Sequence, residues 1–400
     1  MRIAFIGQKG FPARYGGVER HAEELARELA ASGHEVLLYA RRWYTSPPAP
    51  NKTPPGIKII FTPSLHTKHL DTITHTLTAT IHALTQKPDV IHYHGVGPSL
   101  LSWLPRLLAP RARVIVTFHT IDRLHQKWGW FARGVLRLGE LAACRFPHET
   151  IAVSRTLRNY CLTEYARPAR YIPNGARLAE TKTREEEEKS QILSAETLIR
   201  WQLEPNHYIL FCARLVKHKG AHYLIKAWRA LRQQYPELTR ARKLVIVGDS
   251  VFTDRYRAAL HELSAGEASI IFTGWVKPAE LAALYANTLL LVHPSENEGM
   301  SLTVLEAMAR GRAVLLSDIP EHQELVWDKR FLFTNGSVLN LTERLLSLLQ
   351  HPEGLAEAGI KNRFLVSQRY RWSEIAAGTL RLYQANPPEA RESLPRLKPA

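Results

Sequence analysis

Short apolar runs alternate with amphipathic stretches along most of the chain. The first half has apolar runs at residues 3–7, 35–39, 90–94, 114–118, 151–153 and 171–172, and the second half at 209–213, 244–248, 269–273, 289–293 and 313–317. Runs of this kind, without polar alternation, are typical of parallel strands that are buried on both faces. Helical patterns such as residues 18–31 lie between them. The alternation predicts an α/β protein with two Rossmann-like domains, each a parallel sheet covered by helices.

The pattern is interrupted by a polar segment at residues 177–196, which carries four consecutive glutamates and is expected to be a domain linker or a solvated helix. We therefore expect an N-terminal domain at residues 1–178, a linker region at 179–200 and a C-terminal domain at 201–370. The amphipathic stretch 371–385 predicts a final helix, and the Pro-rich stretch 386–400 is expected to be disordered. Ligands of parallel sheets bind beyond the carboxyl ends of the strands, so we expect a site in a cleft between the two domains.

Composition separates the chain from membrane-spanning and disulfide-rich proteins. Apolar residues make up 45% of it, and it has no run of about 18 apolar residues that could span a bilayer. The first predicted strand starts almost at Met1, so we expect no signal peptide. The three cysteines lack the spacing of a metal or redox site, which favours reduced thiols in a cytoplasmic protein.

The net charge of +16 is concentrated in the first half of the chain. Residues 1–178 carry 24 Lys and Arg against 11 Asp and Glu, whereas the remainder carries 29 against 26. A basic half can bind an anionic membrane surface or nucleic acid, or can serve only solubility. Aromatic residues and arginines gather at Trp128, Trp130, Phe131, Arg133, Arg137 and Arg145. We expect an anionic membrane surface as a partner and no nucleic acid; in the alternative, the two tryptophans pack in a core.

Two carboxylates flank a predicted helix N-terminus in the second half. Glu298 follows the predicted strand 289–293, and Glu306 lies eight residues later, inside a helical pattern at 302–310 that Gly311 can end. The free N–H groups and the dipole of a helix N-terminus favour an anion. Carboxylates accept hydrogen bonds from hydroxyls, in which sugars are rich. We expect the loop residues Gly299, Met300, Ser301 and Leu302 to bind a diphosphate between the two acids.

Cations and glycines follow other predicted strands. Arg214 and Lys219 come directly after the strand 209–213, where they can bind a phosphate, so no metal ion is needed to neutralise it. Gly16 and Gly17 precede the helix at 18–31, and this loop lacks the fingerprint of a dinucleotide-binding site. A pair of glycines lets the backbone approach a ligand closely, although it can also be only a permissive loop.

Polar side chains end two further strands. His119 and Asp122 follow the strand 114–118, and His92 and His94 lie at the end of the strand 90–94. A zinc site built from His92, His94 and His119 is rejected, because neither the usual ligand spacing nor supporting carboxylates are evident. The loop of Gly274, Trp275 and Val276 follows the strand 269–273, and its tryptophan can also belong to a core.

The Glu-x7-Glu stretch and its continuation to Glu321 resemble the signature of the retaining glycosyltransferases of family 4, and Arg214 and Lys219 resemble that family's Arg-x4-Lys pair. The resemblance extends over residues 2–383 and implies the GT-B fold, with the final helix crossing back to the first domain. Many members have Glu-Gly-Phe-Gly-Leu-Pro, where this chain has Met300, Ser301 and Thr303.

The resemblance also implies roles for the candidate residues. Glu298 and His119 would lie at the donor sugar, Glu306 at the ribose, the loop 274–276 at the edge of the base, and Gly16 and Gly17 at the donor phosphates and the acceptor. Asp122 is an acceptor-side candidate. The turn at residues 172–175 resembles the family's entry to the linker and is expected to be structural.

These observations favour an enzyme that moves a sugar from a nucleotide-diphosphate sugar to an acceptor hydroxyl with retention of configuration, in polysaccharide or glycolipid synthesis. The nucleotide sugar is a co-substrate, no cofactor or metal is expected, and the acceptor is a sugar or a lipid-linked molecule. No carboxylate is an evident nucleophile for a double displacement. Two alternatives stay open, a nucleotide-sugar epimerase on the same fold and a non-catalytic basic protein that binds a membrane or nucleic acid.

Overall fold

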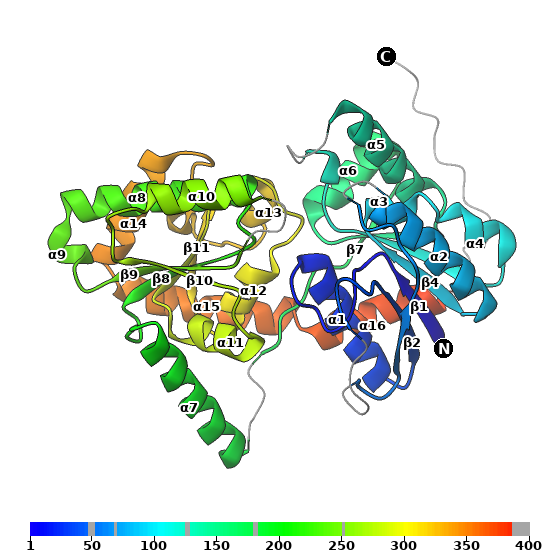
Figure 1. Ribbon diagram of the computed structural model, residues 1–400, viewed down its shortest axis with the longest axis horizontal. Helices are drawn as coiled ribbons and strands as arrows, with labels where there is room; N and C mark the ends of the chain where they lie inside the picture. The colour runs from blue at the N-terminus through cyan, green and yellow to red at the C-terminus, as the bar shows by residue number, and fades with distance from the viewer. Residues whose placement is uncertain (47–52, 68–69, 125–128, 179–182, 250–252, 386–400) are drawn as a thin grey trace. The chain divides into compact units, whose positions relative to one another are not determined.

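The computed structural model describes residues 1–46, 53–67, 70–124, 129–178, 183–249 and 253–385. They form two compact units, the first made of Met1–Ala152, Arg158–Ile172 and the chain from Ile375, the second of Val153–Leu157 and Pro173–Glu374. Each unit is a parallel sheet with helices on both faces, as the sequence predicts (Figure 1). The expected disordered tail at 386–400, the first residues of the expected linker (179–182) and Trp128 lie outside the described residues.

The first sheet has seven parallel strands in the order β3-β2-β1-β4-β5-β6-β7. Their bounds are β1 Arg2–Ile6, β2 Glu35–Ala40, β3 Ile57–Phe61, β4 Val90–His94, β5 Arg113–Phe118, β6 Glu149–Ala152 and β7 Arg170–Tyr171. All but β3 correspond to predicted apolar runs. The strand β3 was missed because it is a partly exposed edge strand in which Lys58 interrupts the apolar run.

Helices cover both faces of the first sheet. One face carries α1 (Gly17–Ala31) and α16 (Trp372–Gln384), and the other carries α2 (Asp71–Thr85), α3 (Val96–Ser99) and α5 (Trp130–Arg145) (Figure 1). The remaining helical segments are α4 (Trp103–Leu108), η1 (Asp122–Leu124) and α6 (Arg155–Tyr165). Ala376 and Tyr383 of α16 are buried in one core with Phe5 and Leu25. The last helix therefore belongs to the first unit, which confirms the expected crossing.

The second sheet has six parallel strands in the order β10-β9-β8-β11-β12-β13. Their bounds are β8 Tyr208–Cys212, β9 Lys243–Val247, β10 Ile270–Gly274, β11 Leu290–His293, β12 Ala313–Ser317 and β13 Leu332–Phe333. One face carries α8 (Ala221–Gln234), α10 (Asp254–Leu263) and α14 (Val338–Gln350), and the other carries α11 (Pro278–Asn287), α12 (Leu302–Ala309) and α15 (Glu353–Arg369) (Figure 1). Short helical segments are η2 (Lys217–Lys219), α9 (Pro236–Thr239), α13 (Pro320–Gln323) and η3 (Lys329–Phe331).

The polar segment between the two predicted domains contains a helix, α7 (Arg184–Arg200), which packs on α11. It begins with a capping box, in which the Thr183 hydroxyl accepts from the Glu186 N–H while the Glu186 carboxylate accepts from the Thr183 N–H. Acidic residues in the first turn and Arg200 in the last turn interact favourably with the helix dipole. The glutamate run therefore stabilises a helix start, one of the two structures expected for this segment.

Each sheet reverses its strand order at one point. In the second unit the reversal lies between β8 and β11, which pair directly through Ile209 with Leu290 and Leu210 with Leu291. In the first unit it lies between β1 and β4. The loops that leave the carboxyl ends of such strand pairs diverge to opposite faces of the sheet, so they open a crevice where ligands bind. Residues that bind a ligand are therefore expected in the loops at these two positions.

The contact between α16 and the first sheet can be tested at Tyr383. Its buried hydroxyl lies 2.6 Å from Nδ1 of His92 on β4. We expect Tyr383→Phe to lower the free energy of unfolding by about 1–3 kcal/mol, because a buried ring nitrogen loses its partner. Urea unfolding followed by circular dichroism measures this. Tyr235→Phe, at a partly exposed tyrosine whose hydroxyl has no bond to a described residue, is the matched control. Equal stability of both variants would contradict the role of this bond.

Candidate active site

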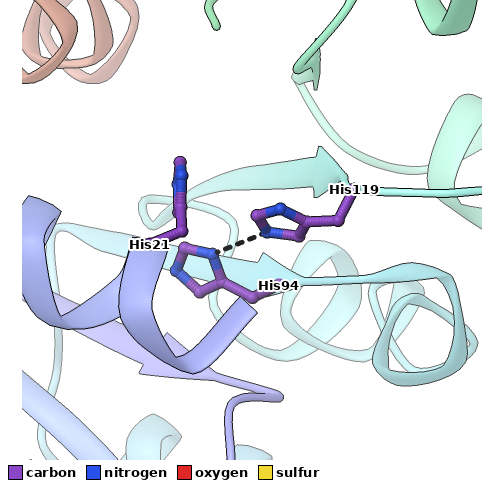
Figure 2. Close-up of side chains that lie close together, drawn as sticks. All are labelled: His21, His94 and His119. Atoms are coloured by element: carbon purple, nitrogen blue, oxygen red, sulfur yellow. Dashed lines mark hydrogen bonds between the residues drawn. The ribbon is translucent and has the colours of Figure 1, made fainter. Parts of the chain in front are cut away.

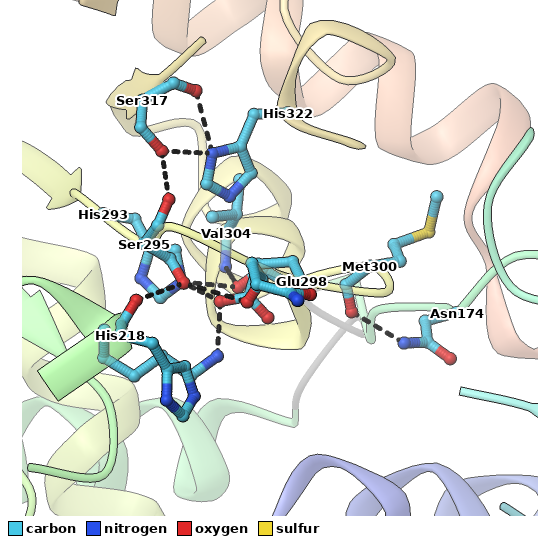
Figure 3. A network of polar contacts seen from close by, with 12 residues as sticks. Asn174, His218, His293, Ser295, Glu298, Met300, Val304, Ser317 and His322 are labelled. Atoms are coloured by element: carbon cyan, nitrogen blue, oxygen red, sulfur yellow. Dashed lines mark hydrogen bonds and ion pairs between the residues drawn. The ribbon is translucent and has the colours of Figure 1, made fainter. Parts of the chain in front are cut away.

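Two loops are joined at the strand reversal of the second unit. One connects β8 to α8 through residues 213–220, and the other connects β11 to α12 through residues 294–301. The Glu296 N–H donates to the His218 carbonyl at 2.8 Å, and the Ser295 hydroxyl donates to the same oxygen at 3.2 Å (Figure 3). Gly220 has a φ of 75°, and a Cβ there would lie 1.9 Å from the Pro294 carbonyl oxygen. Only glycine therefore lets the two loops approach this closely.

Glu298 holds these loops together electrostatically. Its side chain is 9% exposed and accepts from the Lys219 ammonium and from Nε2 of His293, the latter at 2.7 Å. Burial opposes ionisation of Glu298, but the charge of Lys219 and the bond from His293 outweigh it and hold the pKa of the carboxyl well below its usual value. The carboxylate is therefore charged at neutral pH, and two positive or polar donors fix its position.

Several polar residues that sequence reasoning missed surround Glu298. His293 is the last residue of β11, and its Nε2 also lies 3.3 Å from the Ser301 hydroxyl. His322 is fully buried, and its Nδ1 lies 3.0 Å from both the carbonyl and the hydroxyl oxygens of Ser317. Burial lowers the pKa of His322 to about 3, so this ring is neutral. The position of His293 at the end of a predicted strand was the available signal, whereas His322 lies in the short helix α13 and carried no such signal.

The first turn of α12 presents backbone N–H groups that have no partner within the helix. Ser301 caps the helix by accepting from the Val304 N–H at 3.5 Å, and the Met300 carbonyl accepts from the Asn174 side-chain amide at 2.8 Å (Figure 3). Backbone N–H groups in the first turn have no partner within the helix, so those of Leu302 and Thr303 can face a ligand. Asn174 lies in the turn that the sequence predicts to be structural, and here it positions the loop after Glu298.

Arg214 and Glu306 lie near the same strand ends. The half-buried Arg214 guanidinium forms no hydrogen bond or ion pair with any residue that the structure describes. Glu306, half-buried on α12, is close enough to Cys212 at the end of β8 to add to the effect of burial, which raises the pKa of that thiol to about 12. The structure thus brings the predicted Arg214, Lys219, Glu298 and Glu306 to the β8 and β11 ends.

The loop predicted to edge a base follows β10, two strands away from β8. The Gly274 carbonyl accepts from the Gly248 N–H at 3.0 Å, and Gly274 has a φ of 65°. The ring of Trp275 is 45% exposed, so it does not belong to a core, and Val276 is half-buried. The exposed Trp275 thus lies at the carboxyl edge of the sheet, where ligands of such sheets bind.

The first unit carries the other candidates. Gly16 caps α1 with a φ of 105°, and a Cβ there would lie 1.9 Å from a Glu19 carboxylate oxygen. A Cβ on Gly17 would meet nothing within 4 Å, so this residue borders open space. His119 follows β5 and is 7% exposed, and burial together with neighbouring His21 lowers its pKa well below the usual value. Asp122 is half-buried at the start of η1.

Two family models match the two halves of the chain. The model of "Glycosyltransferase Family 4" matches residues 15–180, and the model of "Glycosyl transferases group 1" matches residues 197–365. The chain belongs to the group 1 glycosyltransferases. It is therefore an enzyme of the glycosyltransferase class, and its two matched segments lie one on each side of the polar segment.

Relatives and solved structures agree with this assignment. This glycosyltransferase is 25% identical to the phosphatidyl-myo-inositol mannosyltransferase of Mycobacterium tuberculosis, over 96% of this chain and 97% of the relative. Sucrose-phosphate synthase from Thermosynechococcus elongatus has a TM-score of 0.77 at 20% identity, covering 96% of this chain and 98% of that one. The Anabaena protein HepE, solved with UDP and glucose, has a TM-score of 0.74 at 18% identity, covering 96% and 100%. These structures share the GT-B fold with the glycosyltransferase described here.

The charge state of Glu298 predicts how the stability of the fold depends on pH. Its lowered pKa stabilises the folded chain above pH 4.5, and this contribution is lost as the pH falls from there toward the folded-state pKa. We expect Glu298→Gln to lower the free energy of unfolding by about 1.5–3 kcal/mol at pH 7, and by less at pH 4. Chemical unfolding of both proteins at a series of pH values measures the difference.

Glu321 provides the control, because burial and the neighbouring Glu298 charge raise its pKa to about 7. A raised acid pKa destabilises the folded chain as the pH rises from 4.5 to about 7. Over this interval the free energy of unfolding of the native chain should therefore fall relative to that of Glu321→Gln. The pH dependence is opposite in sign to the one expected for Glu298→Gln. Parallel slopes in the two variants would contradict the assigned charge states.

Proposed function

We propose that this glycosyltransferase moves a sugar from a nucleoside-diphosphate sugar to an acceptor hydroxyl with retention of configuration, in the synthesis of a polysaccharide or glycolipid. One observation carries the proposal: the Arg214 guanidinium, which has no partner in the described ranges of the chain, lies with Lys219 and the N-terminus of α12 near two carboxylates at the β8 and β11 ends. This is a site for a diphosphate joined to hydroxyl-rich groups on both sides. The Anabaena structure with UDP and glucose supports a donor of this class.

Leaving-group stabilisation carries most of the proposed catalysis. Arg214 can grip phosphate oxygens bidentately, and the Lys219 ammonium has three N–H donors, enough to serve Glu298 and a phosphate together. The N–H groups from Gly299 to Leu302 add the positive end of the α12 dipole. Because these groups supply the positive charge, the proposed reaction needs no metal ion.

Retention is proposed to follow a front-face route. The bond between the anomeric carbon and the diphosphate oxygen breaks while the acceptor oxygen bonds to the same carbon on the same face, and the leaving phosphate takes the acceptor proton. A double displacement would need a free carboxylate nucleophile. Glu298 fits that role poorly, because it already accepts from Lys219 and His293, which lowers its nucleophilicity.

The other candidates are given roles by the same proposal. Glu306 accepts from the ribose hydroxyls, and the Gly274–Val276 loop edges the base. In the first unit, the neutral ring of His119 bonds a donor sugar hydroxyl, Gly16 and Gly17 allow close approach of the phosphates, and Asp122 is the acceptor-side group. Because the buried imidazole of His119 stays neutral, it can accept a hydrogen bond as well as donate one.

A ligand screen tests this function directly. Thermal unfolding is recorded in EDTA with UDP, GDP, ADP and their sugar conjugates. We expect one nucleotide to raise the melting temperature, because a ligand at a hundredfold excess over its Kd stabilises by about 2.7 kcal/mol. With a bound donor, release of nucleotide should need an added acceptor and should continue in EDTA. Nucleotide release without any acceptor would favour the epimerase, and no shift with any nucleotide would favour the non-catalytic alternative.

Substitutions separate the two carboxylates. We expect Glu306→Ala to weaken nucleotide binding about tenfold or more and Glu298→Gln to lower kcat by a similar factor, because charge-assisted hydrogen bonds contribute about 1.5–3 kcal/mol. Calorimetry with the nucleotide and a transfer assay measure the two effects. Glu343→Ala, at an exposed glutamate on α14 of the same unit, is the matched control. Wild-type binding and turnover in both site variants would refute the assignment.

We further propose that the enzyme docks on the anionic cytoplasmic face of a membrane through α5. One side of this helix exposes Trp130, Phe131, Leu138 and Leu141, with exposed Arg133, Arg137 and Arg145 on the same stretch. The Trp130 side chain is 86% exposed, so it does not pack in a core as the alternative required. Among the described residues no helix is long and apolar enough to cross a membrane. The mannosyltransferase of Mycobacterium tuberculosis, named for a phosphatidyl lipid, supports a lipid-linked acceptor.

Liposome sedimentation tests the membrane proposal. Binding should appear with phosphatidylglycerol vesicles, disappear with neutral vesicles and fall as salt rises. Arginine contacts with anionic lipid contribute about 1 kcal/mol each, so Arg133→Glu with Arg137→Glu should reduce binding by about tenfold or more. Trp130→Ala should also weaken it, whereas Trp327→Ala, at an exposed tryptophan of the second unit, should not. Equal binding to both vesicle types would refute the proposal.

A further inference from the structure

Three histidines from three separate elements meet in the first unit. His21 lies on α1, His94 ends β4, and His119 follows β5 (Figure 2). All three side chains are buried, and one ring nitrogen of each lies within 4.8 Å of the other two. The residues are far apart in the chain, and the trio weighed from the sequence contained His92 in place of His21. The structure replaces His92 because its two ring nitrogens are bonded to Tyr383 and Thr117, at 2.6 and 2.7 Å.

The spacing of His94 and His119 fits two ligands of one metal ion better than a hydrogen bond. Nδ1 of His94 and Nε2 of His119 are 3.4 Å apart. Good hydrogen bonds from N–H groups fall at about 2.7–3.2 Å, so this pair is at the outer limit. Two nitrogens bound at about 2.0–2.1 Å to a tetrahedral zinc ion lie about 3.3–3.4 Å apart, which is the observed separation.

Burial of the three rings also suits a metal ion. His21, His94 and His119 are 2%, 1% and 7% exposed, so bulk water competes little for their nitrogens. Among the residues that the structure describes, the 3.4 Å contact with His119 is the only hydrogen bond of the His94 ring, so hydrogen bonding within the protein does not account for the cluster.

We propose that His21, His94 and His119 bind one divalent transition metal ion of the zinc type, and that the bound ion inhibits sugar transfer by occupying the His119 nitrogen. Imidazole nitrogen favours zinc, cobalt and nickel over magnesium, which prefers oxygen ligands. Three ring ligands leave a fourth position for water or a substrate hydroxyl. The inhibition rests on the role of His119 in the proposed function, whereas the binding rests on the cluster alone. An inhibitory ion is consistent with transfer that continues in EDTA.

A second group, His293, Glu298 and His322, also has three ligand atoms within 4.8 Å, in the second unit. There the Lys219 ammonium is already paired with the Glu298 carboxylate, so a cation would meet a positive charge. Nε2 of His293 is also already bonded to the same carboxylate, at 2.7 Å. We therefore assign the metal site to the histidines of the first unit and use the second group as a control.

Cobalt titration of the metal-free full-length protein tests the binding. We expect one equivalent to bind and to give the intense visible bands of tetrahedral cobalt, which excess zinc abolishes and magnesium leaves unchanged. His21→Asn and His94→Asn should each weaken binding by about tenfold or more, since a bound zinc ion in such sites depends on every ring ligand. His322→Asn should leave affinity unchanged. Circular dichroism without metal verifies that each variant is folded.

Several results would overturn the binding. These are weak octahedral bands in the native protein, unchanged affinity in both His21→Asn and His94→Asn, and loss of binding in His322→Asn alone. The spectrum of the native protein decides the matter even if a variant fails to fold, because it needs no substitution.

Transfer assays test the inhibition separately. Zinc should inhibit the native enzyme, EDTA should restore its activity, and the residual activity of His21→Asn should be insensitive to zinc. Full transfer by the zinc-loaded native enzyme would overturn the inhibition. A metal-free enzyme that binds cobalt as expected but transfers no sugar would refute the proposed function and leave the metal site in place.

Discussion

The ion pair between Lys219 and Glu298 is the interaction on which the strand ends of the second unit depend. It joins the loop after β8 to the loop after β11, two neighbouring strands at the reversal of the second sheet. A buried carboxylate without a partner would be strongly unfavourable, so the lysine and His293 allow the acid to be both buried and charged. The bonds from the Glu296 N–H and the Ser295 hydroxyl to the His218 carbonyl, with the close approach at Gly220, hold the two loops together around this pair.

The same arrangement explains why Arg214 is distinctive. Lys219 is engaged by the protein, whereas the guanidinium of Arg214, five residues earlier, has no partner within the described part of the chain. A half-buried cation without a counter-charge is costly to keep unless an anion completes it. The two cations of this basic loop therefore differ in role. Lys219 pairs with the Glu298 carboxylate, whereas Arg214 can bind an anion.

The first unit uses histidines where the second uses charges. His92 is fixed between Tyr383 and Thr117, and so links the final helix to the sheet, while His94 and His119 face each other without a good hydrogen bond. Burial lowers the pKa values of His94 and His119 and keeps both rings neutral, which leaves a lone pair on each ring for a hydroxyl. The two units therefore differ in electrostatic character, with neutral histidines at strand ends of the first unit and a buried ion pair at strand ends of the second.

The sequence by itself determined the fold class and the positions of most strands, because apolar runs buried on both faces of a parallel sheet leave an unmistakable pattern. It also determined Glu298, Arg214 and Lys219 as candidates, since they lie in loops that follow predicted strands, and Glu306, which lies in the helix that begins after Glu298. It did not predict β3, whose edge position exposes part of the strand, and it left α7 open, because a solvated helix has no apolar face to detect. Only the tertiary structure decided the partners. Glu298 meets Lys219, Asn174 meets Met300 and His21 joins His94 and His119 across long stretches of chain. Such pairings follow from strand order and loop packing, which bring together residues whose separation in sequence carries no signal of their contact.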